Sequence, residues 1–183
     1  MVEFALVLPI FLLLVMGILD FGFLFYNYIS LENAARNASR VACVEYDRVA
    51  YDFDNNEKIT TRTITLPAEN ATSAAAYDGL KPGGVALSEE EIDICTKVAD
   101  SVSHTGIVKE GITVTIQYTY DTNEKVISDG NWKRADRYKG DVVVTVKAKA
   151  QVLTPILGVT ADHMKKDLTS SSTFKVEQQY TDS

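Results

Sequence analysis

VEFALVLPIFLLLVMGILDFGFLFYNYISL, residues 2–31, is the stretch that decides the fold, because it is almost wholly apolar over more than the length of a membrane-spanning helix. An α-helix needs about 20 apolar residues to cross the hydrocarbon core of a bilayer. The segment can therefore span a membrane. It also holds two carboxylates, Glu3 near its start and Asp20 within the apolar run, and a charge in hydrocarbon needs a partner or a purpose.

A cleavable secretory signal is the main alternative to a spanning helix. Such a signal has a basic start, an apolar run of about 7–15 residues and a small-residue cleavage site, and this segment has none of these. It continues instead into LENAARNASRVACVEY, residues 31–46, where apolar side chains recur at helical spacing. The sequence therefore predicts one continuous helix from about residue 2 to the mid-forties, about 65 Å long at the standard rise.

This N-terminal stretch resembles that of TadE-like pilins, the pilin-related proteins of tight-adherence (Tad) systems within the type IV filament superfamily. The resemblance covers about 40 residues and rests on the order of four elements, namely Glu3-Phe4-Ala5, Pro9, the cluster from Gly17 to Gly22 and the exit from Asn33 to Arg36. A weaker likeness covers GDVVVTVKAKAQVLTPILG, residues 140–158, and SSSTFKVEQQ, residues 170–179.

The resemblance implies a prepilin, whose short basic leader ending in glycine is removed by a prepilin peptidase. The mature helix then anchors in the inner membrane until the pilus assembly machinery draws it into an extracellular filament or filament tip. No such leader precedes Met1, and Glu3 lies two places earlier than the fifth mature position usual for the pilin glutamate. Two explanations stay open: the sequence starts a residue or two inside the mature protein, or the leader lies upstream of Met1.

Five residues of the predicted helix are candidate assembly residues: Glu3, Pro9, Gly17, Asp20 and Gly22. In a core of packed helices, Glu3 can pair with the α-amino group of a neighbouring subunit, whereas the alternative is an exposed acid in the headgroup zone. Asp20 either finds a polar partner in the filament or lies as an interfacial acid in an aromatic belt. Pro9 and the two glycines weaken a lone helix but let packed helices approach and bend.

Residues 1–46 are thus predicted to form a transmembrane and polymerisation helix, and residues 47–183 one extracytoplasmic α+β head, since about 135 residues suffice for one modest core. Ser88 and Glu91 form a capping box that starts a second helix over about residues 89–104. Strand-like patterns of period two follow in ITVTIQYTY (112–120), DVVVTVKAKAQV (141–152) and LTSSSTFKVEQQ (168–179), with RTITLP (62–67) as a short candidate. We expect a type IV pilin-like fold, with an antiparallel sheet of three or four strands packed on the long helix.

Cys43 and Cys95 are the only cysteines. Both fall on the extracytoplasmic side of the predicted span, where disulfides persist. A bridge between them would close a loop of about 50 residues and stabilise the fold by about 2–4 kcal/mol. The sequence therefore predicts a Cys43–Cys95 disulfide, with two buried free thiols as the alternative.

Composition argues against two broad classes of function. The formal charge of −7 and pI near 4.8 oppose nucleic-acid binding, which requires a basic face. The two histidines, His104 and His163, lack metal-ligand spacing, and no nucleophile elbow or phosphate loop occurs. We therefore expect no enzyme activity, no metal and no cofactor.

The favoured function is a structural pilin or pilin-like subunit of a type IV or Tad-type filament, which serves adhesion or surface attachment. Its partners would be copies of itself or other pilins, packed through the N-terminal helix. The sequence leaves open whether it is a major or a minor subunit. Two alternatives remain: a membrane-anchored extracytoplasmic binding module that does not polymerise, and a pseudopilin of a secretion system.

Overall fold

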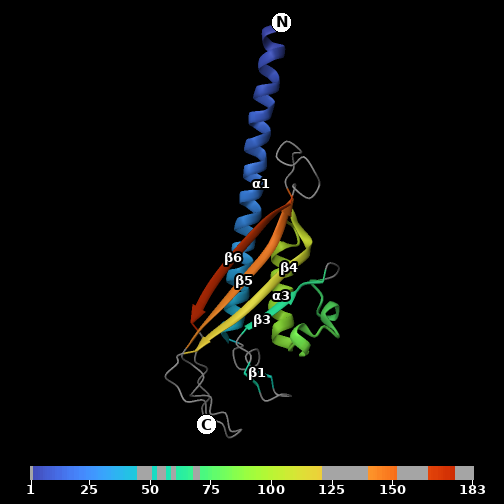
Figure 1. Cartoon of the computed structure of the whole chain (residues 1–183), viewed down its shortest axis with the longest axis vertical. Coiled ribbons are helices and arrows are strands. Elements are labelled where there is room, and N and C mark those ends of the chain that lie inside the picture. Colours follow the sequence, from blue (N-terminus) through green and yellow to red (C-terminus); the bar gives the residue numbers. More distant parts are fainter. Residues whose placement is uncertain are drawn as a thin grey trace.

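The fold is α+β, with a long N-terminal helix beside a second helix and a four-stranded antiparallel sheet (Figure 1). This confirms the predicted fold class. The computed structural model describes residues 2–44, 51–52, 57–58, 61–67, 71–120, 140–151 and 165–175. The last residues of the third predicted strand, 176–179, and His163 lie outside these ranges.

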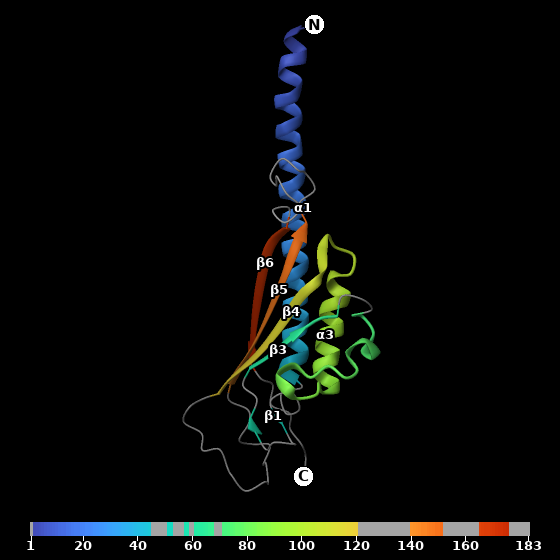
Figure 2. The ribbon, with the colours of Figure 1, turned by 45° about the vertical axis from the view of Figure 1, so that its right-hand side comes forward.

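The first helix, α1, spans Val2–Val44 and contains Pro9. Its bounds confirm the predicted continuous helix. The half that contains the N-terminus projects beyond the sheet, whereas the other half lies against the sheet and the second helix (Figures 1 and 2). Small residues on the packed half let these elements approach closely, and Ala34, Ala35, Ala38 and Ala42 are all fully buried.

The sheet has the strand order β3-β4-β5-β6, and every neighbouring pair is antiparallel. The strands are β3 (Thr61–Thr65), β4 (Ile107–Tyr120), β5 (Gly140–Gln151) and β6 (Lys165–Lys175). Two further strands, β1 (Tyr51–Asp52) and β2 (Glu57–Lys58), form a separate antiparallel pair.

Alternate side chains of each long strand are buried, as the period of two predicts. Val142, Val144 and Val146 of β5 are all fully buried. They join side chains of α1, β3, β4 and the second helix in one core. The opposite face is mostly polar, as the outward residues Thr145, Lys147 and Lys149 of β5 show, although it includes Val143.

The second helix, α3, spans Glu89–Val102 and ends two residues before the predicted His104. The predicted capping box is present. The Glu91 N–H donates to the Ser88 hydroxyl at 3.2 Å, and the Ser88 N–H donates to a Glu91 carboxylate oxygen at 3.0 Å. Two short 3₁₀ helices before it, η1 (Ala74–Tyr77) and η2 (Pro82–Gly84), were not predicted.

The predicted Cys43–Cys95 disulfide is wrong, because both cysteines are free, buried thiols. Helices α1 and α3 run side by side in opposite directions (Figure 2), and Asn27 of α1 is level with Gly106 just beyond α3. Both cysteine side chains pack in the hydrophobic core, and the Cys43 thiol donates to the carbonyl of Arg40 at 3.0 Å.

Gly106 is the point where α1 comes closest to the turn between α3 and β4. A Cβ atom on Gly106 would lie 2.0 Å from Cζ of Phe23. Only a residue without a side chain therefore fits against the Phe23 ring. Gly106 also donates its N–H to Oδ1 of Asn27 at 3.0 Å and accepts from the N–H of Gln151 at 3.3 Å. The backbone of Gly106, just after α3, thus contacts both α1 and the end of β5.

Substituting Gly106 with alanine is expected to destabilise the head by about 1–3 kcal/mol, the usual cost of overpacking. The added methyl must displace the Phe23 ring from the joint. Shortening that ring in the double variant Gly106→Ala with Phe23→Leu should restore part of the loss. Urea unfolding of the full chain in detergent measures both. Gly17→Ala is the control, because the added methyl meets no neighbouring atom within 4 Å and should not lower the stability of the head. Gly79→Ala is unsuitable, because Gly79 has a φ of 77°.

Candidate assembly helix

An exposed apolar surface covers the projecting half of α1. Apart from Val44 and Leu80, every large hydrophobic side chain that is exposed in the described part of the chain lies on this helix between Phe4 and Ile29. By length and composition, α1 could cross a membrane. An apolar surface of this extent indicates a membrane or a protein partner.

The predicted assembly residues fall into two groups. Pro9, Gly17 and Gly22 are exposed on the projecting half, and a Cβ at either glycine would meet no atom within 4 Å. Another helix could therefore approach the backbone closely at these glycines. The side chain of Glu3 lies outside the described part of the structure. Asp20 differs from the others, because it is only 1% exposed.

The burial of Asp20 follows from its position on the helix. Its neighbours Leu19 and Phe21 are 58% and 72% exposed. Asp20, Asn27 and Ala34 are seven residues apart and all buried, so they share one stripe along α1. Asp20 therefore begins the covered stripe of the helix and does not belong to the exposed apolar surface.

Asn27 is a buried polar residue near the point where α1 meets the head. It is fully buried, and its Oδ1 accepts the hydrogen bond from Gly106. Its Nδ2 has no hydrogen-bond partner. A buried unpaired donor lowers stability, so the polar contact at this joint is incompletely satisfied.

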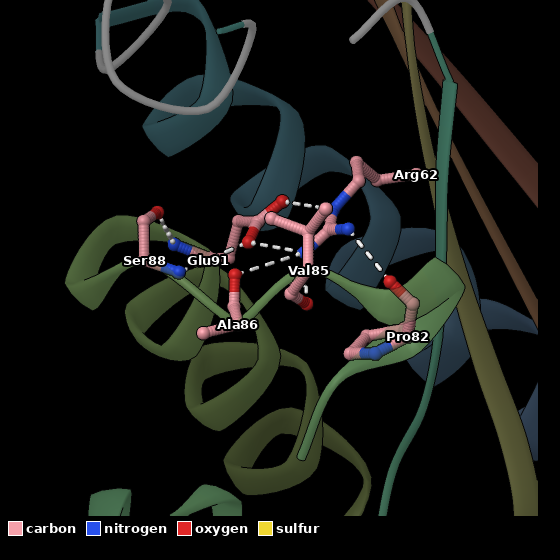
Figure 3. Close-up of polar contacts among 6 residues, drawn as sticks. All are labelled: Arg62, Pro82, Val85, Ala86, Ser88 and Glu91. Carbon is pink, nitrogen blue, oxygen red and sulfur yellow. Dashed lines mark hydrogen bonds and ion pairs between the residues drawn. The ribbon is translucent and has the colours of Figure 1, made fainter. Parts of the chain in front are cut away.

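Sequence reasoning missed the main polar contact of the head, which joins β3 to α3 (Figure 3). Arg62 donates from Nε to Oε1 of Glu91 at 2.8 Å and from Nη2 to Oε2 at 3.1 Å. Arg62 and Glu91 are only 6% and 2% exposed. The guanidinium also donates to the backbone carbonyls of Pro82 at 2.7 Å, Val85 at 3.4 Å and Ala86 at 3.2 Å.

This pair holds the segment before α3 against the sheet. Because Glu91 also closes the capping box with Ser88, one carboxylate serves both the start of α3 and its attachment to β3. The sequence signal was an arginine at an inward position of the short strand pattern RTITLP, where an apolar side chain is usual. Such a residue requires a buried acid as a partner.

Cys95 lies one turn beyond Glu91 on α3. Burial first, and the nearby Glu91 carboxylate second, raise the pKa of the Cys95 thiol from 9.0 to about 12. Burial, with a smaller effect from Cys95, also raises the pKa of Tyr77, whose hydroxyl donates to the carbonyl of Ala71 at 2.7 Å. Both groups are therefore neutral at physiological pH.

Cys95 is expected not to react with thiol reagents at pH 8 while the head is folded, because the thiolate is the reactive form. Below about pH 9 the Cys95 thiol keeps its proton in both the folded and the unfolded state, so its titration does not lower the stability of the head. Between pH 9 and about 12 the unfolded state loses its proton first, and stability falls as pH rises. Iodoacetamide labelling and urea unfolding across this range test this, with Cys95→Ala as the control. An equal decline in Cys95→Ala would contradict the assignment.

The geometry of α1 combines an exposed apolar half, close-approach glycines and a packed half that carries the head. Residues 1–40 match the family model of TadE-like proteins. The TadE-like match ends within α1 and includes none of the sheet. It indicates a protein associated with the Tad pilus. No curated protein and no solved structure matches the chain.

Proposed function

We propose that this protein is a pilin-like structural subunit, anchored in the membrane by α1 and packed through α1 into a Tad-type filament that displays the head outward. The observation that carries this proposal is the exposed apolar surface between Phe4 and Ile29. Water does not stabilise so large an apolar surface, whereas hydrocarbon or a bundle of equivalent helices does. The TadE-like match of the same segment agrees with either environment.

The length of the apolar surface suits a bilayer. From Phe4 to Ile29 the helix extends about 39 Å, which exceeds the hydrocarbon core of about 30 Å. Tyr26 and Tyr28 lie near its head-proximal end and are 52% and 42% exposed. Aromatic side chains with a polar tip favour the boundary between lipid and water.

The filament is the second environment of the helix. Pro9, Gly17 and Gly22 lie on the exposed half, where the glycines permit close backbone contact between helices. In this proposal Glu3 pairs with the α-amino group of the next subunit and sets the axial register. The role is structural and needs no cofactor and no catalytic step. We propose adhesion or surface attachment as its outcome.

Cryo-electron microscopy of filaments sheared from the cells that make the protein tests the proposal. A helical map with α1 packed in the core would support a shaft subunit, and sparse subunits at one end would support a minor one. A protein confined to the membrane fraction would overturn the filament proposal and favour an anchored module that does not polymerise.

Glu3→Ala should abolish incorporation into filaments while the protein still enters the membrane. Glu32→Ala is the matched control, because Glu32 is a partly exposed acid on the same helix whose ion-pair partner, Arg36, is also on α1. If both variants assemble like the wild type, Glu3 has no role in register.

A further inference from the structure

One end of the sheet is level with the point where α1 leaves the head. The N–H of Gln151, the last residue of β5, donates to the carbonyl of Gly106 at 3.3 Å, and Gly106 in turn contacts Asn27 and Phe23 of α1. At the opposite end, the Tyr118 hydroxyl donates to the carbonyl of Ala42 at 3.2 Å. The end of β5 and the start of β6 therefore lie nearest the exposed apolar half of α1 (Figure 1).

Lys165 and Lys166 begin β6 at this end, and Lys149 and Lys147 lie two and four residues before the end of β5. We call these four lysines the basic rim. All four are exposed. The register places Lys165 opposite Gln151, and Lys166 opposite Ala150. The rim therefore extends from the second half of β5 to the first residues of β6.

The rim carries a local positive charge on an acidic protein. Asp167 is the one acid on these two strand ends, and Glu110 of β4 lies near them. Among the ion pairs recorded between described residues, none involves a rim lysine. Asp167 lies directly opposite Lys149, just as Asp141 lies opposite Lys175 at the far end of the sheet. The other three rim lysines, Lys147, Lys165 and Lys166, lie opposite no acid in the register of a chain whose formal charge is −7.

The depth of the rim follows from the length of α1. This step rests on the proposed function, since it takes α1 as the membrane span. About 20 residues counted from Phe4 place the hydrocarbon boundary near Phe23. Asn27 lies about 6 Å beyond that boundary, and the polar layer on each side of a bilayer is about 5–7 Å thick. Lys165 and Lys166, at the start of β6, are therefore held at the depth of the lipid headgroups. Lys149 and Lys147 lie about 7 Å and about 14 Å farther along β5 from the bilayer.

We propose that the basic rim binds the headgroups of anionic phospholipids on the outer face of the membrane and so holds the head against the bilayer before assembly. Lysine stems reach across apolar surface while the ammonium groups remain in the polar layer. An anionic surface at about −30 mV concentrates cations about threefold, and this effect extends over about one Debye length. A lipid is the expected ligand, and not free phosphate, because the helix fixes Lys165 and Lys166 at headgroup depth.

Lysine footprinting on the full chain in vesicles tests the proposal. The protein is reconstituted in phosphatidylcholine, with or without about one-third phosphatidylglycerol, and acetylated with a membrane-impermeant reagent. In anionic vesicles at low salt, Lys165 and Lys166 should be labelled about threefold more slowly, since protons are concentrated at the surface by the same factor. High salt should remove the difference. Lys97 and Lys175 are exposed internal controls away from the rim and should not change.

A charge-removing variant provides the second measurement. Lys165→Gln with Lys166→Gln should reduce the protection of Lys149, whereas the matched pair Lys97→Gln with Lys175→Gln should leave it intact. Equal labelling of the rim in neutral and anionic vesicles would overturn the lipid proposal. Inorganic phosphate added to neutral vesicles distinguishes a lipid headgroup from free phosphate as the ligand. Protection of the rim lysines by free phosphate would also contradict a lipid ligand.

Flotation of the same vesicles after alkaline carbonate treatment separates this proposal from the membrane anchor itself. A protein that floats with neutral vesicles but shows no lipid-dependent protection retains its anchor and lacks the rim contact. A protein that does not float with either vesicle has no anchor, and the proposed function fails as well.

Discussion

Replacing Arg62 with alanine is expected to lower the free energy of unfolding of the head by about 3–5 kcal/mol, because the buried Glu91 carboxylate then loses its cation. The change also removes the donors to three backbone carbonyls between Pro82 and Ala86. Urea unfolding of the full chain in detergent, followed by near-ultraviolet circular dichroism, measures the loss. The tyrosines of the head report on its packing in that signal.

The exposed ion pair between Glu32 and Arg36 provides the matched control. Arg36→Ala removes an arginine of the same kind from an i, i+4 surface pair, which usually contributes about 0.3–0.5 kcal/mol. Replacing both buried partners, Arg62→Met with Glu91→Leu, should cost less than Arg62→Ala because no unpaired charge remains. Equal losses for Arg62→Ala and Arg36→Ala would show that the buried pair does not hold β3 to α3.

Changing Leu13 and Leu14 together to arginine is expected to remove the protein from the membrane. Both leucines are 57% exposed near the middle of the projecting helix. One arginine at the centre of a spanning helix costs about 2.5–3.5 kcal/mol, so two cost about 5–7 kcal/mol. The fraction that resists alkaline carbonate extraction from vesicles should fall accordingly.

Leu80→Arg is the control for this variant, because Leu80 is an exposed leucine of the head, at 37%. It should leave the membrane-bound fraction unchanged. A further pair, Leu13→Ala with Leu14→Ala, removes the leucine side chains without adding charge and should remain in the membrane. If the arginine variant stays resistant to carbonate, α1 is not the membrane anchor.

Local sequence patterns predicted the main elements, because each pattern is typical of one kind of secondary structure. The long apolar run became α1, the capping box began α3 and the alternating stretches became β4, β5 and β6. The start of β4 was less accurate. The sequence indicated a strand from Ile112, whereas β4 begins at Ile107. Its register shifts between Val108 and Thr113, and Gly111 there has a φ of 75°. That irregularity interrupts the alternation that would have revealed the earlier residues.

The candidate site was predictable only in part. The apolar surface and the glycines of α1 could be read from composition, because no tertiary contact is needed to expose them. The free state of Cys43 and Cys95 and the pair of Arg62 with Glu91 depend on how α1, α3 and β3 pack. The burial of Asp20 is likewise a tertiary property. Such distances involve residues far apart in the chain. The compartment in which a disulfide can persist predicted a bond, but the two cysteines are free thiols packed in the core.

The side-by-side packing of α1 against the head has a mechanical consequence. The contact extends from Asn27, which bonds Gly106, to Ala42, which bonds Tyr118. A pull along the stem therefore loads the whole length of this contact in shear, and its side chains resist the force together. A sideways pull on the projecting end loads the Asn27 contact first. The contacts along the helix then break one after another. In a filament under axial tension, the heads would thus stay packed against α1. Bending of the filament would separate them from the helix more easily.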